Sequence, residues 1–366
     1  MVSAGRPTRH FRTCPARPLR PGFATPDVPG FHDAVQVANP LQTRGLRWYS
    51  YQRQSPNPFN APQLPATAGR PEPRSVQALQ IIISGIAQGC IYGLIALGVV
   101  LIYKATETVS FAQGELMMLG AFGGLMVMTL LGLPFWFALI AAVLAMSAFG
   151  MLLERAVIRP ILGQPAFSVV MLTIGIGYVL RGLVTMIPNI GTDTHTLPVP
   201  YKDAVWKAGA LVLNVEQLVI IAATVVLSAA LYAMFKYSKL GVAMQAASQN
   251  QLAAYYMGIP VRRLNGLVWG LAAGVAAIAG LLLAPITFVH ANMGFIGLKA
   301  MPAAVVGGFG SLPGALVGGL VIGVVEALAG FYLPEGFKDI AAYVVVLVML
   351  VVKPSGLFGD KLRKKV

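Results

Sequence analysis

The sequence is poor in charged residues and in cysteine. Asp, Glu, Lys and Arg make up 11% of its 366 residues, whereas a soluble globular domain carries about 25%, and this difference excludes an ordinary soluble protein. The two cysteines, Cys14 and Cys90, are too few and too differently placed to indicate a disulfide framework or a metal site. Hydrophobic residues, in contrast, make up 57% of the chain, which predicts a membrane protein.

Sequence motifs for nucleotide binding and for hydrolysis are also lacking. No GxxxxGK[ST] stretch occurs, so ATP, if it drives this protein, must be bound by another chain. We therefore expect no cofactor and no catalytic residue here. A membrane hydrolase with Ser311 as nucleophile and His290 as base is the weakest alternative, because the GxSxG spacing is missing and Gly-Ser shortly before a proline indicates a turn.

Long apolar runs dominate the chain after residue 78. Each can cross a hydrocarbon core of about 30 Å when tilt is allowed. Backbone polar groups must be satisfied inside lipid, and the runs are too long for barrel strands, so they predict an all-α polytopic membrane protein, a helical bundle. Glycines at packing distance, such as Gly85, Gly89 and Gly93, predict close helix contacts. The eight long runs lie at about 79–103, 116–131, 135–153, 167–187, 216–235, 264–286, 313–330 and 338–352.

Basic residues in the loops predict the orientation of the bundle. Arg155 and Arg159 mark one loop as cytoplasmic, and lysines and arginines mark 236–263 likewise, whereas 188–215 faces outward. Eight crossings alone would leave both basic ends of the chain outside. Two additional short or discontinuous elements, at about 105–116 and 298–310, would place both ends in the cytoplasm. Their matching positions indicate two pseudo-repeated halves, as in many transporters.

The ends of the chain differ in composition from the membrane part. Residues 1–75 hold ten arginines, three acidic residues and 13 of the 25 prolines, which predicts a disordered extension. It is either a targeting or anionic-surface segment or, as we favour, translated upstream sequence with the true start near Val76. We assign residues 76–360 to the membrane domain, 241–264 to a cytoplasmic loop within it, and 361–366 to a basic cytoplasmic tail.

Polar side chains inside the two interrupted segments are the candidate functional residues. A charged group at membrane depth costs at least about 2.5 kcal/mol, so it survives where it faces a partner, a cavity or water. Such residues line or gate a route for a polar solute, or they tie two broken helices together. We expect an ion pair between Glu115 and Lys299, and we expect Arg181 and Glu326 to join helices or to lie at the membrane interface. The predicted pathway residues are Ser110, Gln113, Glu115, His290, Asn292 and Lys299.

The cytoplasmic loop 241–264 has helical periodicity without enough apolar residues to cross lipid. An apolar stripe ends in Tyr255 and Tyr256, and Gly258 and Pro260 indicate the helix end. A helix lying on the bilayer is the alternative, but the loop's arginines lie beyond the helix, so we favour docking into a groove of another protein. The residues predicted to couple to that partner are Gln245, Gln249, Asn250, Tyr255, Met257 and Gly258.

Several blocks of sequence, in order, carry a resemblance to a known family. They are GIAQGCIYGLIALGVVLIY, SFAQGELMMLGAF, ERAVIRP, AASQNQLAAYYMGIPVRRL, GLKAMPAAVVGGFGSLPGALVGGLVIGVVEAL and VKPSGLFG. From about residue 76 to 360 the chain resembles the membrane subunit of branched-chain amino acid ABC transporters, the LivH type. The resemblance implies a bacterial inner-membrane importer with a second permease chain, expected to be a paralogue, two ATP-binding subunits and an external solute-binding protein. It implies lipid but no nucleic acid as a further partner.

The resemblance also implies roles and leaves the solute open. The segment 243–260 looks like the family's coupling helix, with Gly258 at the position of a characteristic glycine. Ser110 and Gln113 stand where the family usually has Asn and His, and Gln245 replaces a common acidic residue. We expect alternating-access import of branched-chain amino acids or of a related small polar solute, such as urea or an amide. A passive channel or an ion-coupled carrier, needing no ATPase, is the alternative.

Overall fold

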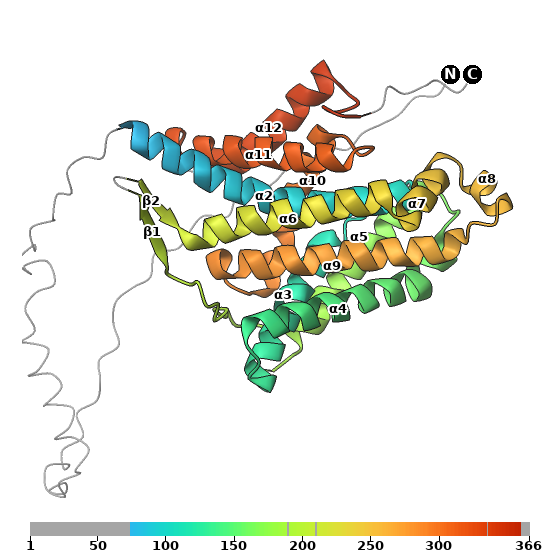
Figure 1. Ribbon diagram of the computed structural model, residues 1–366, viewed down its shortest axis with the longest axis horizontal. Coiled ribbons are helices and arrows are strands. Elements are labelled where there is room, and N and C mark those ends of the chain that lie inside the picture. Colours follow the sequence, from blue (N-terminus) through green and yellow to red (C-terminus); the bar gives the residue numbers. More distant parts are fainter. Residues whose placement is uncertain (1–73, 189, 209–210, 335, 360–366) are drawn as a thin grey trace, which may run out of the picture. The chain divides into compact units, whose positions relative to one another are not determined.

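The structure, a computed structural model, describes residues 74–188, 190–208, 211–334 and 336–359. Nearly all of the predicted extension 1–75 and the whole tail 361–366 lie outside these residues. The elements, shown in Figure 1, are α2 (Arg74–Thr106), α3 (Gln113–Leu131), α4 (Phe135–Leu153), η2 (Glu154–Ile158), η3 (Arg159–Ile161), α5 (Ala166–Thr185), β1 (Val205–Ala208), β2 (Leu211–Asn214), α6 (Val215–Tyr237), α7 (Lys239–Gln249), α8 (Gln251–Tyr256), α9 (Val261–Thr287), η4 (Ala291–Phe295), α10 (Ile296–Gly307), α11 (Leu312–Tyr332) and α12 (Phe337–Val352).

The prediction of an all-α polytopic membrane protein is confirmed. Among the described residues, seven helices are long and apolar enough to cross a membrane. The eighth run, 338–352, forms α12, whose 16 residues span only about 24 Å at 1.5 Å per residue. The sole sheet in the described part of the chain is the β1–β2 hairpin, in which Val205 pairs with Asn214 and Trp206 with Leu213.

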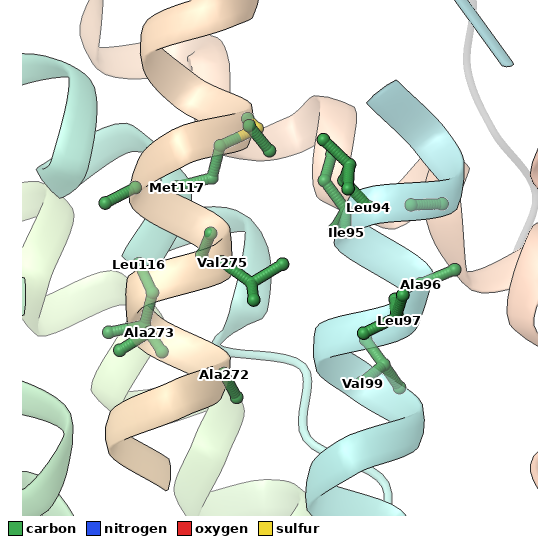
Figure 2. Packing of buried hydrophobic residues seen from close by; sticks show 14 of the residues in the cluster. Leu94, Ile95, Ala96, Leu97, Val99, Leu116, Met117, Ala272, Ala273 and Val275 are labelled. Atoms are coloured by element: carbon green, nitrogen blue, oxygen red, sulfur yellow. The ribbon is translucent and has the colours of Figure 1, made fainter. Parts of the chain in front are cut away.

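Helices α2 and α9 form the centre of the bundle. Of the most apolar 18-residue window of each, 89% and 83% is buried, against 22% to 33% for α4, α5 and α6. Figure 2 shows side chains of α2, such as Leu94 and Leu97, packed among those of α3 and α9, such as Leu116 and Ala272. The peripheral helices therefore expose most of their apolar surface to lipid or to another chain.

Glycines allow α2 and α11 to pack with their backbones in contact. A methyl group added at Gly85 would lie 2.9 Å from Cα of Val324, and one added at Gly89 would lie 2.8 Å from Cα of Leu320. Residue numbers rise along α2 as they fall along α11, so the helices are antiparallel. The predicted glycine-mediated helix contact is confirmed, since only a residue without a side chain fits at these distances.

One end of the bundle gathers the cytoplasmic loop, the end of α2 and the C-terminal segment. Three contacts join them: Gln251 with Ala105, Tyr103 with Phe309, and Leu357 with Val306. Helix α2 has 33 residues and is about 50 Å long, so it begins at the opposite end, beside the hairpin (Figure 1). The C-terminal segment therefore lies at the same end of the bundle as 236–263, whereas α2 begins at the opposite end.

The expectation that the membrane domain begins on the same side as 236–263 is therefore wrong, for a structural reason. The segment 105–116 is not a crossing element of its own: α2 continues to Thr106, residues 107–112 are not helical, and α3 begins at Gln113. The second short element does exist, as η4 followed by the 12-residue α10. The chain therefore has one additional half-crossing, where two were expected. Compared with eight crossings alone, only the C-terminal end changes sides.

Candidate functional site

Two interruptions lie at 107–112 after α2 and at 288–295 after α9, and the start of α3, just after the first, meets the second inside the bundle. Gly114, in the first turn of α3, packs against η4 and α10: a methyl group added there would lie 2.9 Å from Cα of Gly297 and would overlap the carbonyl oxygen of Gly294. Backbones this close require glycine on both sides. The prediction that both halves of the chain contribute to one region is consistent with this contact.

Ser110, in the first interruption, and Gln113, at the start of α3, are both buried inside the bundle. Each is 1% exposed, and Gln113 Nε2 donates a hydrogen bond of 2.9 Å to the carbonyl oxygen of Ala272 in α9. Gln113 also lies against Gly98, eight residues before the end of α2, so α3 begins about 12 Å inside the bundle. Ser110 Oγ and Gln113 Oε1 have no hydrogen-bond partner among the described residues.

Glu115 forms an ion pair with Arg181 of α5, so the predicted pair between Glu115 and Lys299 is wrong. The reason is the phase of α10. Gly297 faces Gly114, and Lys299, two residues on, lies about 200° around the helix, on the opposite face.

Lys299 instead points to α11 and α12. Its Nζ lies 3.4 Å from Glu326 Oε1 and contacts Asp339 Oδ1 as well. The prediction that Arg181 and Glu326 join helices is confirmed, and Lys299 belongs to such a tie rather than to the region around Glu115.

His290 and Asn292 lie at the outer side of the second interruption. His290 is half-buried, with Nδ1 3.3 Å from the carbonyl oxygen of Phe288, and Asn292 is exposed. The adjacent Val289 exchanges two backbone hydrogen bonds, of 2.8 and 2.9 Å, with His195 of the external loop. Across the described ranges, no hydrogen bond joins either side chain to Ser110, Gln113 or Glu115, so the six predicted pathway residues form three separate groups.

A pocket opens beside the Glu115–Arg181 pair. Its volume is about 260 Å³, and the guanidinium carbon of Arg181 lies 3.8 Å from the centre of the Phe295 ring. Gly177 makes room for Glu115, since a methyl group there would lie 3.1 Å from Glu115 Cγ. Sequence reasoning did not assign Arg181 to the site. The sequence signal that could have identified it was a single arginine in an apolar run, four residues after Gly177. The pocket is lined by Phe111, Glu115, Ile174, Gly177, Tyr178, Arg181, Gly294, Phe295 and Leu298.

The cytoplasmic loop forms two short helices rather than the single predicted one. Asn250 adopts an extended backbone, and its Oδ1 accepts a hydrogen bond of 2.9 Å from the backbone N–H of Ala253, which caps α8. This break splits the predicted apolar stripe. Met244 and Ala247 of α7 are buried, at 9% and 5% exposure, whereas the large apolar side chains of α8 are exposed.

The exposed face of α8 contains several predicted coupling residues. Tyr255 is 65% exposed, Tyr256 76% and Met257 82%, and Gly258, with φ of +82°, ends the segment in a conformation that favours glycine. Gln245 donates a hydrogen bond of 3.3 Å to Phe235 of α6 and so holds α7 to the bundle.

Gln251, which sequence reasoning missed, links α8 to the first interruption. Its Nε2 donates a hydrogen bond of 2.9 Å to the carbonyl oxygen of Ala105 in the last turn of α2. A polar pocket of about 520 Å³ lies between this junction and the two short helices. Its lining includes Thr106, Glu107, Gln164, Gln249, Asn250 and Gln251.

Comparisons with known proteins show the family of the chain. Residues 81–353 match the family described as branched-chain amino acid transport system / permease component. The chain is 31% identical over 296 residues to the high-affinity branched-chain amino acid transport system permease protein LivH of Escherichia coli K12, covering 77% of this chain and 95% of that protein. It is 29% identical over 299 residues to BraD of Pseudomonas aeruginosa, covering 78% and 97%. It is 26% identical to the fructose import permease protein FruG of Bifidobacterium longum, covering 63% and 71%.

Proposed function

Because the chain belongs to the permease family of branched-chain amino acid transport systems, we propose that it forms the membrane route of an ABC importer for these amino acids. A related small polar solute, such as urea or an amide, is the alternative cargo, since the relatives differ in what they carry and include a fructose import permease. Transport proceeds by alternating access, driven by an ATPase on separate chains.

The observation that carries this proposal is the meeting of two interrupted helices around polar groups. Gly114 and Gly297 bring the segments together, and the Glu115–Arg181 pair lies beside that contact with a pocket in front of it. Transporters place solute sites where discontinuous helices from two halves of the chain meet. Ser110 and Gln113, buried with unpaired oxygens on the same segment, are further candidates to line the route when it opens.

Coupling to ATP hydrolysis runs through α8 in this proposal. The exposed Tyr255 and Tyr256 of α8 and the following Met257 form an apolar surface suited to a protein groove. Gln251 joins the same helix to the end of α2, which leads directly into residues 107–112 and Gln113. A partner that pulls on α8 therefore displaces the segment that holds the polar groups, over a short and continuous path.

The complete importer contains further subunits. We propose ATP-binding subunits at α8, a second permease chain, expected to be a paralogue, and an external solute-binding protein. The peripheral α4, α5 and α6, whose apolar surfaces are largely exposed in one chain, leave room for a second permease chain as well as for lipid.

Reconstitution tests this proposal. The chain is co-expressed with the candidate ATPase, permease and binding-protein genes, purified and placed in proteoliposomes. We expect uptake of radiolabelled leucine that needs both ATP and the binding protein. Uptake at the same rate without the ATPase would instead support a passive or ion-coupled carrier and contradict the proposal.

A further inference from the structure

The pocket beside Glu115 combines two opposite charges with an apolar wall. Glu115 and Arg181 lie at one side, with 10% and 15% of their side chains exposed. Ile174, Phe295 and Leu298 supply apolar lining, and the volume is about 260 Å³. Ligand pockets for drug-sized molecules measure about 300–1,000 Å³, so this one suits a smaller solute.

Neither charged group uses all of its hydrogen-bonding capacity. Glu115 Oε2 and Arg181 Nε are buried, and neither makes a hydrogen bond with any residue that the structure describes. A carboxylate accepts at both oxygens, and a guanidinium carries five N–H donors. In this conformation the pair therefore leaves one acceptor and one donor unpartnered and closed off behind the wall of the pocket, which a pure tie between helices does not require.

We propose that this pocket binds a zwitterionic α-amino acid during transport. The solute's ammonium group lies against Glu115, its carboxylate against Arg181, and its aliphatic side chain against Ile174, Phe295 and Leu298. The inference rests on the proposed function and narrows its cargo to zwitterions, because neutral urea or an amide that separated the pair would leave both charges without an ionic partner.

In this proposal, Glu115 and Arg181 exchange each other for the charged groups of the solute, so neither side chain is left with an unpaired charge. When the pocket is empty, Glu115 and Arg181 neutralise each other. A zwitterion that enters between them supplies an opposite charge to each. Because breaking a buried pair without replacement is strongly unfavourable, a solute carrying only one charge opens the pair at a cost that a zwitterion does not incur. The pocket therefore selects for both charges together.

Direct binding to the assembled permease–ATPase complex, without the binding protein, tests this assignment. Saturation-transfer NMR is recorded in nanodiscs with leucine, 4-methylpentanoate, which lacks the ammonium group, and 3-methylbutylamine, which lacks the carboxylate. For the wild type we expect leucine to bind at least tenfold more tightly than either analogue. Arg181→Gln should lose at least tenfold in leucine affinity but keep 3-methylbutylamine binding, and Glu115→Gln should keep 4-methylpentanoate binding instead.

A second variant keeps the test valid if the charge changes impair folding. Leu298 lines the pocket and is 41% exposed. Leu298→Trp should therefore fill the pocket while leaving the ion pair intact, and we expect it to lose at least tenfold in leucine affinity. Matched controls are Arg155→Gln, Glu216→Gln and Leu144→Trp, all outside the pocket, which should bind leucine as the wild type does.

Two results would overturn the inference and separate it from the proposed function. Unchanged leucine affinity in Leu298→Trp overturns the pocket assignment, whatever the charge variants show. A wild type that binds leucine no better than the analogues overturns it as well. If ATP-dependent leucine uptake still proceeds in proteoliposomes, only the inference is lost; if uptake is absent too, the proposed function is lost with it.

Discussion

Gln251 donates a 2.9 Å hydrogen bond from its side-chain amide to the carbonyl oxygen of Ala105. The bond joins α8, the segment proposed to dock on the ATPase, to the last turn of α2. Just beyond Ala105 the chain passes through the non-helical segment 107–112 to Gln113, which is held in turn by Ala272 of α9. The exposed helix α8 is thus connected to the buried side chain of Gln113 by one hydrogen bond and the short segment from Ala105 to residue 112.

Removal of the hydrogen bond between Gln251 and Ala105 should partly uncouple ATP hydrolysis from transport. Gln251→Met keeps the length of the side chain and removes the donor. A typical hydrogen bond contributes about 0.5–1.5 kcal/mol, so we expect uptake per ATP hydrolysed to fall about two- to tenfold. Gln77→Met, at an exposed position near the outer end of α2, is the control and should be silent. Equal ratios of uptake to hydrolysis in both variants would contradict the proposed link.

Truncation of the exposed α8 side chains should weaken ATPase attachment without unfolding the protein. Tyr255 and Met257 are 65% and 82% exposed, so they contribute little to the bundle itself. In the double variant Tyr255→Ala/Met257→Ala we expect reduced co-purification of the ATPase subunit and loss of ATP-dependent uptake, with an unchanged thermal midpoint of the permease alone. Tyr237→Ala, 76% exposed at the end of α6, serves as control. The assignment fails if both variants retain the ATPase equally.

The Glu115–Arg181 pair should behave as a unit in a double-mutant cycle. Glu115→Gln or Arg181→Gln leaves one buried charge without its partner, which costs about 3–5 kcal/mol in buried pairs. We expect each single variant to lower the melting temperature of the detergent-solubilised protein, and the double variant to be no worse than either. Lys299→Gln combined with Glu115→Gln should instead give additive losses, because Lys299 pairs with Glu326 and Asp339. Additivity within the first pair would argue against the contact.

The backbone contact between the two interruptions predicts a sharp difference between two glycines of α3. Gly114→Ala would place a methyl group against the carbonyl oxygen of Gly294, whereas Gly123 has open space around it. We expect Gly114→Ala to lower the yield of folded, monodisperse protein severalfold. Gly123→Ala should be neutral or stabilising by up to about 1 kcal/mol, since Ala favours helix. Size-exclusion chromatography and thermal melting in detergent measure both effects, and equal behaviour would contradict the contact.

Much of the fold follows from local sequence patterns. The apolar runs predicted the long helices, and polar residues together with glycine marked both interruptions. The pairing of charges did not follow, because it depends on helix phase and on which helices are neighbours. Lys299 lies on the face of α10 opposite Gly297, and Arg181 reaches Glu115 only because α5 packs beside α3. Neither relation is visible in spacing along the chain.

The cytoplasmic loop shows a different limit. Asn250 caps α8 and separates it from α7, and asparagine is a favoured N-cap residue, so the break could have been predicted. The helical periodicity of apolar residues continues across Asn250, and this continuity concealed the capping signal. The proposed docking surface is consequently smaller than the predicted stripe and is restricted to α8 and the residues just after it.

The central claim, that a solute route opens between the two interrupted helices under the control of ATP, is tested most directly by cysteine accessibility. In this structure Ser110 is 1% exposed and Phe295 46%. Single substitutions Ser110→Cys and Phe295→Cys, with Cys14 and Cys90 replaced by Ala, are labelled with a water-soluble thiosulfonate in the reconstituted complex, with and without trapped ATP. The account predicts that trapping the alternative state raises labelling at residue 110 and lowers it at residue 295. Labelling that is the same in both states at both positions would contradict it.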